Sequence, residues 1–138
     1  MTDAEKKYHG SCLCGSINYE IEKPFIFFQY CHCSRCRKST GSAFSPNIMI
    51  KAHQFKWTKG AEVVKRFMPE TAKLFCTGFC PNCGSNMPWY SRNDKYVIIP
   101  AGTLDDDPEC KPQRSIYWDS RAPWYADACD LEKLSEAE

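Results

Sequence analysis

The chain has 138 residues, with 18 basic and 17 acidic side chains and a formal net charge of +1. This balance argues against a protein that grips the phosphate backbone of nucleic acids, since such proteins carry a marked basic excess. The longest aliphatic and aromatic run covers only residues 25–28, far fewer than the roughly 20 residues of a membrane-spanning helix. We therefore expect neither a nucleic-acid nor a membrane partner. Residues 1–8 mix acidic and basic side chains without an apolar leader segment, which predicts a cytoplasmic protein.

The apolar pattern predicts many short strands. Ile17, Tyr19 and Ile21 alternate with polar neighbours, as in a half-buried strand. Further strands are expected, in chain order, over 25–30, 43–50, 63–67, 74–76, 87–90, 96–99 and 116–118. Helices are expected only directly after Cys33 and within 126–138. This pattern predicts a mainly β fold in a single domain over 1–138, with its core at about 8–124 and a short tail at 125–138.

Ten cysteines are an unusual number for a chain of this length. In a reducing compartment, dense cysteines favour metal binding over disulfides. Seven of the ten fall in three clusters, which are Cys12-Leu13-Cys14-Gly15, Cys31-His32-Cys33-Ser34-Arg35-Cys36 and Cys80-Pro81-Asn82-Cys83-Gly84.

The two outer clusters each offer a pair of thiolates. Cys12 and Cys14 would project to one face of an extended segment, and Cys80 and Cys83 have the C-x-x-C spacing of a tight turn. Two such pairs supply the tetrahedral Cys₄ set of a structural zinc site, which would couple metal binding to folding. Disulfides or unliganded core thiols are the alternative.

The middle cluster differs, because Cys31, Cys33 and Cys36 supply three thiolates within six residues. Three protein ligands on a tetrahedral metal leave one position for water or substrate, which is typical of a reactive site. His32 should point to the opposite face of the segment and pack there, rather than bind the metal. Spacing leaves open a closed site in which the fourth ligand is Cys76, Cys110 or Cys129.

Three basic residues, Arg35, Arg37 and Lys38, lie beside the middle cluster. They either attract an anionic ligand to the metal or form a solvated basic edge. Four aromatic residues are candidates for a pocket wall, although such side chains more often belong to the core. They are Phe44, Trp89, Tyr90 and Trp118.

Taken in order, the three clusters resemble the glutathione-dependent formaldehyde-activating enzyme family, also called the GFA/CENP-V family. The resemblance extends to Thr40-Gly41-Ser42-Ala43-Phe44, to Ala101-Gly102-Thr103-Leu104-Asp105 and to Ala122-Pro123-Trp124. It covers nearly the whole chain, from about Tyr8 to Trp124.

The resemblance implies an Mss4-like, β-rich fold with two zinc ions per chain. In the family pattern the structural zinc would be held by Cys12, Cys14, Cys80 and Cys83. The catalytic zinc would be held by Cys31, Cys33 and Cys36. The implied activity condenses formaldehyde with glutathione to S-hydroxymethylglutathione, a carbon–sulfur lyase reaction in reverse. The implied partners are a small thiol such as glutathione and a small carbonyl, and Arg35, Arg37 and Lys38 become candidates to bind the glutathione carboxylates.

Two residues depart from the family pattern. Cys76 is an additional thiol just before the second C-x-x-C pair, where it could compete for a metal. Ser115 stands where the family often has a histidine, which leaves the substrate less certain than the fold.

Two other functions fit parts of the sequence. A zinc-binding module for protein or nucleic acid is one alternative, although the near-zero net charge speaks against nucleic acid. An oxidoreductase similar to methionine sulfoxide reductases is the other, and it would need a free reactive cysteine such as Cys76, Cys110 or Cys129. The acidic run 105–109 lacks the spaced ligands of a calcium loop and is expected to be a solvated turn.

Overall fold

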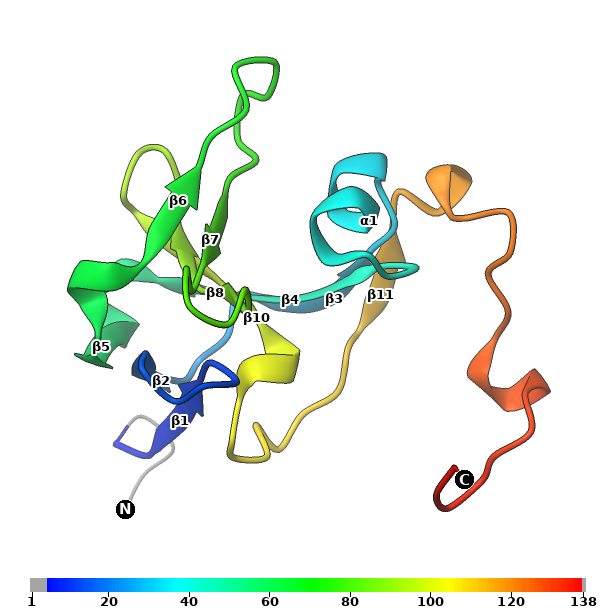
Figure 1. Ribbon diagram of the computed structural model, residues 1–138, viewed down its shortest axis with the longest axis horizontal. Coiled ribbons are helices and arrows are strands. Elements are labelled where there is room, and N and C mark those ends of the chain that lie inside the picture. The colour runs from blue at the N-terminus through cyan, green and yellow to red at the C-terminus, as the bar shows by residue number, and fades with distance from the viewer. Residues whose placement is uncertain (1–4, 138) are drawn as a thin grey trace.

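The protein, described here from a computed structural model of residues 5–137, is built mainly from short β-strands in three small sheets (Figure 1). The first sheet has the order β1-β2-β5. Its strands are β1 (Lys7–Ser11), β2 (Asn18–Glu22) and β5 (Phe55–Lys59), and all neighbours are antiparallel.

The second sheet has five strands in the order β11-β3-β4-β10-β9. Their bounds are β3 (Phe27–Cys31), β4 (Ser45–Lys51), β9 (Trp89–Tyr90), β10 (Tyr96–Pro100) and β11 (Arg114–Ile116). β11 pairs with β3 in parallel, so that the late segment of the chain is held beside Cys31. The third sheet joins β6 (Lys65–Phe67), β7 (Thr77–Phe79) and β8 (Asn86–Met87).

The core lies between the first two sheets. The alternation seen in the sequence is realised there, since Ile17, Tyr19 and Ile21 are fully buried. They pack in one cluster with residues of the central strands, among them Ile48, Ile50, Val97 and Ile99. Burial of this apolar surface is the main force that holds the sheets together.

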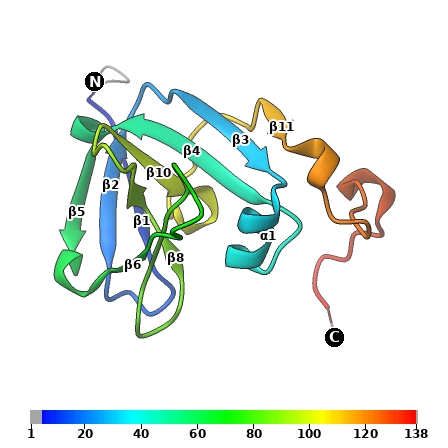
Figure 2. The same cartoon turned by 90° about the horizontal axis from the view of Figure 1, so that it is seen from above.

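The expected helix after Cys33 is present as α1 (Ser34–Thr40). The Cys33 sulfur caps its start by accepting a hydrogen bond from the Cys36 backbone N–H, at 3.3 Å. The helix ends at Gly41, whose φ of 66° is easily reached by glycine. Figure 2 shows α1 next to the end of β3 and the start of β4.

The expected C-terminal helix is wrong. Between 126 and 137 the chain forms only a 3₁₀ turn, η5 (Ala128–Asp130). Every residue of this stretch is exposed, so it has no packed apolar face to stabilise a helix. The other 3₁₀ turns are η1 (Ala52–Gln54), η2 (Ala61–Val63), η3 (Ala101–Thr103) and η4 (Trp118–Ser120). No helix within residues 5–137 is long and apolar enough to cross a membrane.

Several strand predictions need correction. The strand expected over 63–67 starts at Lys65, because residues 61–63 form a 3₁₀ turn. The stretch 74–76 is not a strand, and β7 begins only at Thr77. The stretch 87–90 is divided between two strands of different sheets, β8 and β9. The strand expected over 116–118 lies earlier, at Arg114–Ile116. The strands β1 and β5 were not predicted, because their sequences, KYHGS and FKWTK, contain many polar residues.

Candidate functional site

The first cysteine cluster joins the two outer pairs, and its four sulfurs, from Cys12, Cys14, Cys80 and Cys83, lie within 4.8 Å of one another. The Sγ–Sγ distance is 3.6 Å between Cys12 and Cys14, and 3.8 Å between Cys14 and Cys80. Four sulfurs at about 2.3 Å from a tetrahedral zinc would be about 3.8 Å apart. The cluster therefore has the spacing of a metal site. It has no disulfide, because all ten cysteines are free.

Two similar turns bring these sulfurs together. Cys12 and Cys14 were expected on an extended segment, but they lie in a turn in which the Gly15 N–H donates to the Cys12 carbonyl at 3.0 Å. In the second turn the Gly84 N–H donates to the Cys80 carbonyl at 2.8 Å. Gly15 and Gly84 have φ values of 79° and 78°, which side chains other than glycine rarely adopt. The prediction that Cys12 and Cys14 lie on one face of an extended segment is thus wrong, and it is the turn that brings their sulfurs together.

Two serines that the sequence reasoning missed support this cluster. The Ser16 Oγ lies 3.0 Å from the Cys14 sulfur, and the Ser85 Oγ lies 3.2 Å from the Cys83 sulfur. Hydrogen bonds led by Ser16 lower the pKa of Cys14 to about 5, and those led by Ser85 lower the pKa of Cys83 to about 7. Thiolates are the form that binds metals, so both serines favour the metal-binding state. In the sequence, each of these serines could have been recognised by its position two residues after a cysteine of the cluster.

The second cluster lies where β3 passes into α1. The sulfurs of Cys31, Cys33 and Cys36 lie within 4.8 Å of one another, and no further Cys, His, Asp or Glu of residues 5–137 joins them. A hydrogen bond from Cys36 is the main cause that lowers the pKa of Cys31 to about 6. The same bond raises the pKa of Cys36, so Cys31 is the thiol of this pair that loses its proton first. Three thiol ligands at this spacing fit a metal ion with one coordination position left for another ligand.

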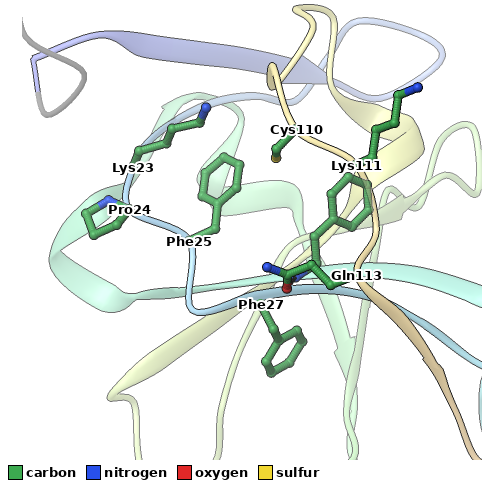
Figure 3. A pocket seen from close by; sticks show the side chains of 8 residues that line it. Lys23, Pro24, Phe25, Phe27, Cys110, Lys111 and Gln113 are labelled. Carbon is green, nitrogen blue, oxygen red and sulfur yellow. Dashed lines mark hydrogen bonds between the residues drawn. The ribbon is translucent and has the colours of Figure 1, made fainter.

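The three remaining cysteines lie outside both clusters. Cys76 is fully buried, and the Arg66 guanidinium donates to its sulfur at 3.6 Å. Cys110 and Cys129 are exposed. Cys110 borders a separate hollow of about 420 Å³, where Figure 3 shows it near Phe25 and Lys111. None of the three therefore completes the three-cysteine cluster.

His32, between two cluster cysteines, points away from the sulfurs into an aromatic group. Its ring centroid lies 5.2, 5.1 and 5.2 Å from those of Phe44, Trp118 and Tyr125. Burial lowers the pKa of His32, and neither ring nitrogen has a hydrogen-bond partner among the described residues. The ring thus packs the segment 31–33 against the C-terminal part of the chain. The sequence pattern predicts this packing role for His32.

Two neighbouring cavities lie on the side of the three-cysteine cluster where Cys36 is found. The inner chamber holds about 50 Å³, and the outer groove holds about 620 Å³. The inner chamber is lined by Cys36, Ser39, Thr40, Ser45, Asn47, Phe75, Cys76, Thr77, Gly78, Asn86, Met87, Trp89 and Pro100. The outer groove is lined by Arg35, Lys38, Ser39, Phe67, Pro69, Thr71, Phe75, Thr77, Phe79, Gly84 and Asn86. Since four lining residues are common to both, the two spaces adjoin, and only the inner one reaches Cys36.

The basic residues beside the cluster have different positions. Arg35 and Lys38 line the outer groove, and the Arg35 guanidinium donates to the Thr71 carbonyl at 3.2 Å. Arg37 lines neither space, and its Nε is buried without a hydrogen-bond partner among residues 5–137.

Of the four aromatic candidates, only Trp89 lines the inner chamber. Phe44 stacks on Tyr30, and Trp118 packs on His32. Tyr90 packs against Phe55 of the core.

Ser115 lies in β11 opposite Tyr30, one position before the residue that pairs with Cys31.

Comparison with known proteins points to one family. A family model described as "Glutathione-dependent formaldehyde-activating enzyme" matches residues 7–120. A protein of Halomonas elongata, to which the same enzyme name is given provisionally, is 29% identical over 111 residues, which cover 76% of this chain and 70% of the relative. A crystal structure of a Rhodobacter sphaeroides protein has a similar fold, with a TM-score of 0.58 and 21% identity, over 78% of this chain and 98% of that one.

Proposed function

The chain belongs to the glutathione-dependent formaldehyde-activating enzyme family, and on this premise we propose that it joins a small thiol, such as glutathione, to formaldehyde or a related carbonyl. One observation carries the proposal: Cys36 is a member of the three-cysteine cluster and also a wall of the inner chamber. A ligand in that chamber would lie next to the cluster. The proposed setting is the cytoplasm, where small thiols are abundant and cysteines stay reduced.

The proposed reaction forms one carbon–sulfur bond. The thiol sulfur attacks the carbonyl carbon, the C=O π electrons move to oxygen, and the thiol proton ends on that oxygen. The product is an S-hydroxymethyl adduct, and nothing is oxidised or reduced. The reverse direction is a carbon–sulfur lyase reaction, in which the hydroxyl proton returns to the departing sulfur.

The two cysteine clusters would hold two zinc ions, as their sulfur spacing and thiol chemistry fit that metal. Cys31, Cys33 and Cys36 are proposed as ligands of the catalytic ion, and the four-cysteine cluster as the structural site of an Mss4-like fold. A zinc ion in the three-cysteine cluster would lower the pKa of a thiol bound to it and so supply the nucleophile.

The protein's own residues would hold the carbonyl compound. In the inner chamber the Ser45 hydroxyl donates to Asn47 Oδ1 at 2.8 Å, so the carbonyl end of the Asn47 amide is already engaged. The amide –NH₂ of Asn47 is then the end available to donate to a carbonyl or hydroxyl oxygen. We propose Asn47 as this donor, with Ser45 as the residue that orients it.

The size of the chamber suits a very small carbonyl. A volume of about 50 Å³ leaves room for about one or two water-sized molecules, on the scale of 30 Å³ for a liquid water. Formaldehyde is of this size. The chamber would also restrict water around the new bond, which limits loss of the adduct by competing hydration.

A calorimetric titration with glutathione and S-methylglutathione tests the proposal. With the zinc-loaded protein, glutathione should bind at least about tenfold more tightly, a difference of about 1.4 kcal/mol, because only the free thiol can become a metal ligand. The Cys33→Ser variant should lose that difference. Equal binding of the two peptides by the wild type would contradict the proposed role of the sulfur.

A further inference from the structure

We propose that the outer groove selects a thiol that has an apolar body and a carboxylate but no free ammonium group, so that glutathione is not the thiol that fits it best. This inference rests on the proposed function in one respect, namely that the thiol end of the ligand reaches the inner chamber. The preference for a carboxylate and an apolar body, and against an ammonium group, follows from the charges and side chains that line the groove.

The charges of the groove are of one sign. Arg35 and Lys38 are its charged lining residues, and within residues 5–137 no Asp or Glu lines the groove or the inner chamber. A carboxylate therefore meets cations, whereas an ammonium group meets like charge and no anionic partner. Desolvating an unpaired ammonium is costly. Glutathione carries two carboxylates and one ammonium, so one of its charges has no counterpart here.

The opposite wall of the groove is aromatic. Phe67, Phe75 and Phe79 line it together with Pro69. Phe67 is 59% exposed, which leaves a large apolar surface in water unless a ligand covers it. An aromatic ring of a ligand would gain from burial against this wall and from ring stacking. The polar peptide groups of glutathione would gain much less.

The basic wall and the aromatic wall come from different elements, and this arrangement fixes the orientation of a bound ligand. Arg35 and Lys38 belong to α1, while Phe67 and Phe79 belong to β6 and β7, and Figure 1 shows these two strands to the left of α1. Phe75 lines both the groove and the inner chamber. A thiol carboxylate can thus direct its sulfur past Phe75 toward Cys36, its carboxylate to α1 and its ring to the phenylalanine wall.

The test compares two ligands whose sulfur is blocked, so that neither can react. They are 2-(methylthio)-3-phenylpropanoate, with one carboxylate, one ring and no amine, and S-methylglutathione. Calorimetry on the full zinc-loaded chain should give the phenyl compound a dissociation constant at least about tenfold lower, about 1.4 kcal/mol, which is the order expected from burying one ring. Phe67→Ala should remove most of this advantage, whereas Lys38→Gln should weaken the binding of the phenyl compound by removing a cation for its carboxylate.

Trp124→Ala is the matched control, because Trp124 is 68% exposed and lines neither space. It should leave both affinities unchanged. The inference is overturned if S-methylglutathione binds as tightly as the phenyl compound, or if Phe67→Ala has no more effect than Trp124→Ala.

The outcome of this binding comparison does not depend on whether the protein catalyses a reaction. If the phenyl compound binds in the groove but no thiol is converted with any carbonyl, the proposed function fails while this inference stands. If glutathione is converted and S-methylglutathione is the better groove ligand, the inference fails while the proposed function stands.

Discussion

The sulfurs of Cys14 and Cys80 lie 3.8 Å apart, although 66 positions separate the two residues in the sequence. Cys14 lies in the turn between β1 and β2, and Cys80 follows β7. A metal held by both turns would therefore fasten the first sheet to the third. Such a link removes conformational freedom from the unfolded chain and couples metal binding to folding.

Replacing a ligand of this cluster should destabilise the whole protein. We expect Cys83→Ser to lose one metal ion and to unfold or become insoluble, because a structural zinc site contributes on the order of 10 kcal/mol to folding. Thermal unfolding followed by circular dichroism, with metal analysis of the same sample, measures both effects. A stable Cys83→Ser protein with an unchanged melting temperature would show that the cluster is not structural.

Replacing a ligand of the other cluster should affect activity rather than the fold. Cys33 also caps α1, and serine is a good helix cap, so Cys33→Ser keeps the start of the helix. We expect one metal ion of two to be lost, a melting temperature close to that of the wild type, and activity reduced by about 100-fold or more. Retained activity in a protein with only one metal ion would contradict the assignment of the reactive site.

Gly10 tests how tightly β1 packs on β2. It pairs with Tyr19, and a Cβ on Gly10 would lie 2.2 Å from the Tyr19 ring. Because the Tyr19 ring is fully buried, it cannot move aside freely. We expect Gly10→Ala to lower the free energy of unfolding by about 1–3 kcal/mol.

Gly102→Ala is the control for that variant, because a Cβ there meets no atom of residues 5–137 within 4 Å. It should change the free energy of unfolding by no more than about 0.5 kcal/mol. Urea denaturation of both variants measures the difference, and equal stabilities would show that the β1–β2 contact is looser than described.

Trp89 should limit the size of the carbonyl substrate. It lines the inner chamber, and its ring centroid lies 6.2 Å from that of Phe75. We expect Trp89→Ala to raise the rate with acetaldehyde relative to formaldehyde by roughly tenfold, since the removed ring makes room for an additional methyl group. Competition assays with one thiol and both aldehydes give this ratio directly. An unchanged ratio would show that another residue sets the limit.

The fold and the two clusters could be predicted from the sequence to different degrees. The clusters are visible because metal ligands need fixed residue types at short spacing, as in Cys31, Cys33 and Cys36. The strand β1 is not visible, because its apolar content is small and its place is decided by pairing with β2. The C-terminal helix was predicted from local composition, but helices of this length need tertiary packing, which residues 126–137 lack.

The groove next to the three-cysteine cluster could not be predicted from the sequence. Its walls combine α1 with β6 and β7, and the aromatic candidates chosen from the sequence lie mostly elsewhere. Phe67, Phe75 and Phe79 were not singled out, since nothing in their local sequence distinguishes a pocket wall from the core. Only the tertiary fold places them in the same groove as Lys38.

The proposed role of the three-cysteine cluster is to form the adduct between a thiol and a carbonyl compound. Exchange NMR with ¹³C-formaldehyde and a thiol measures the rate at which the S-hydroxymethyl carbon interconverts with free formaldehyde. We expect this rate to rise in proportion to added zinc-loaded wild-type protein and not to rise with Cys33→Ser. An equal rise with both proteins, or no rise with either, would show that the three-cysteine cluster does not perform this reaction.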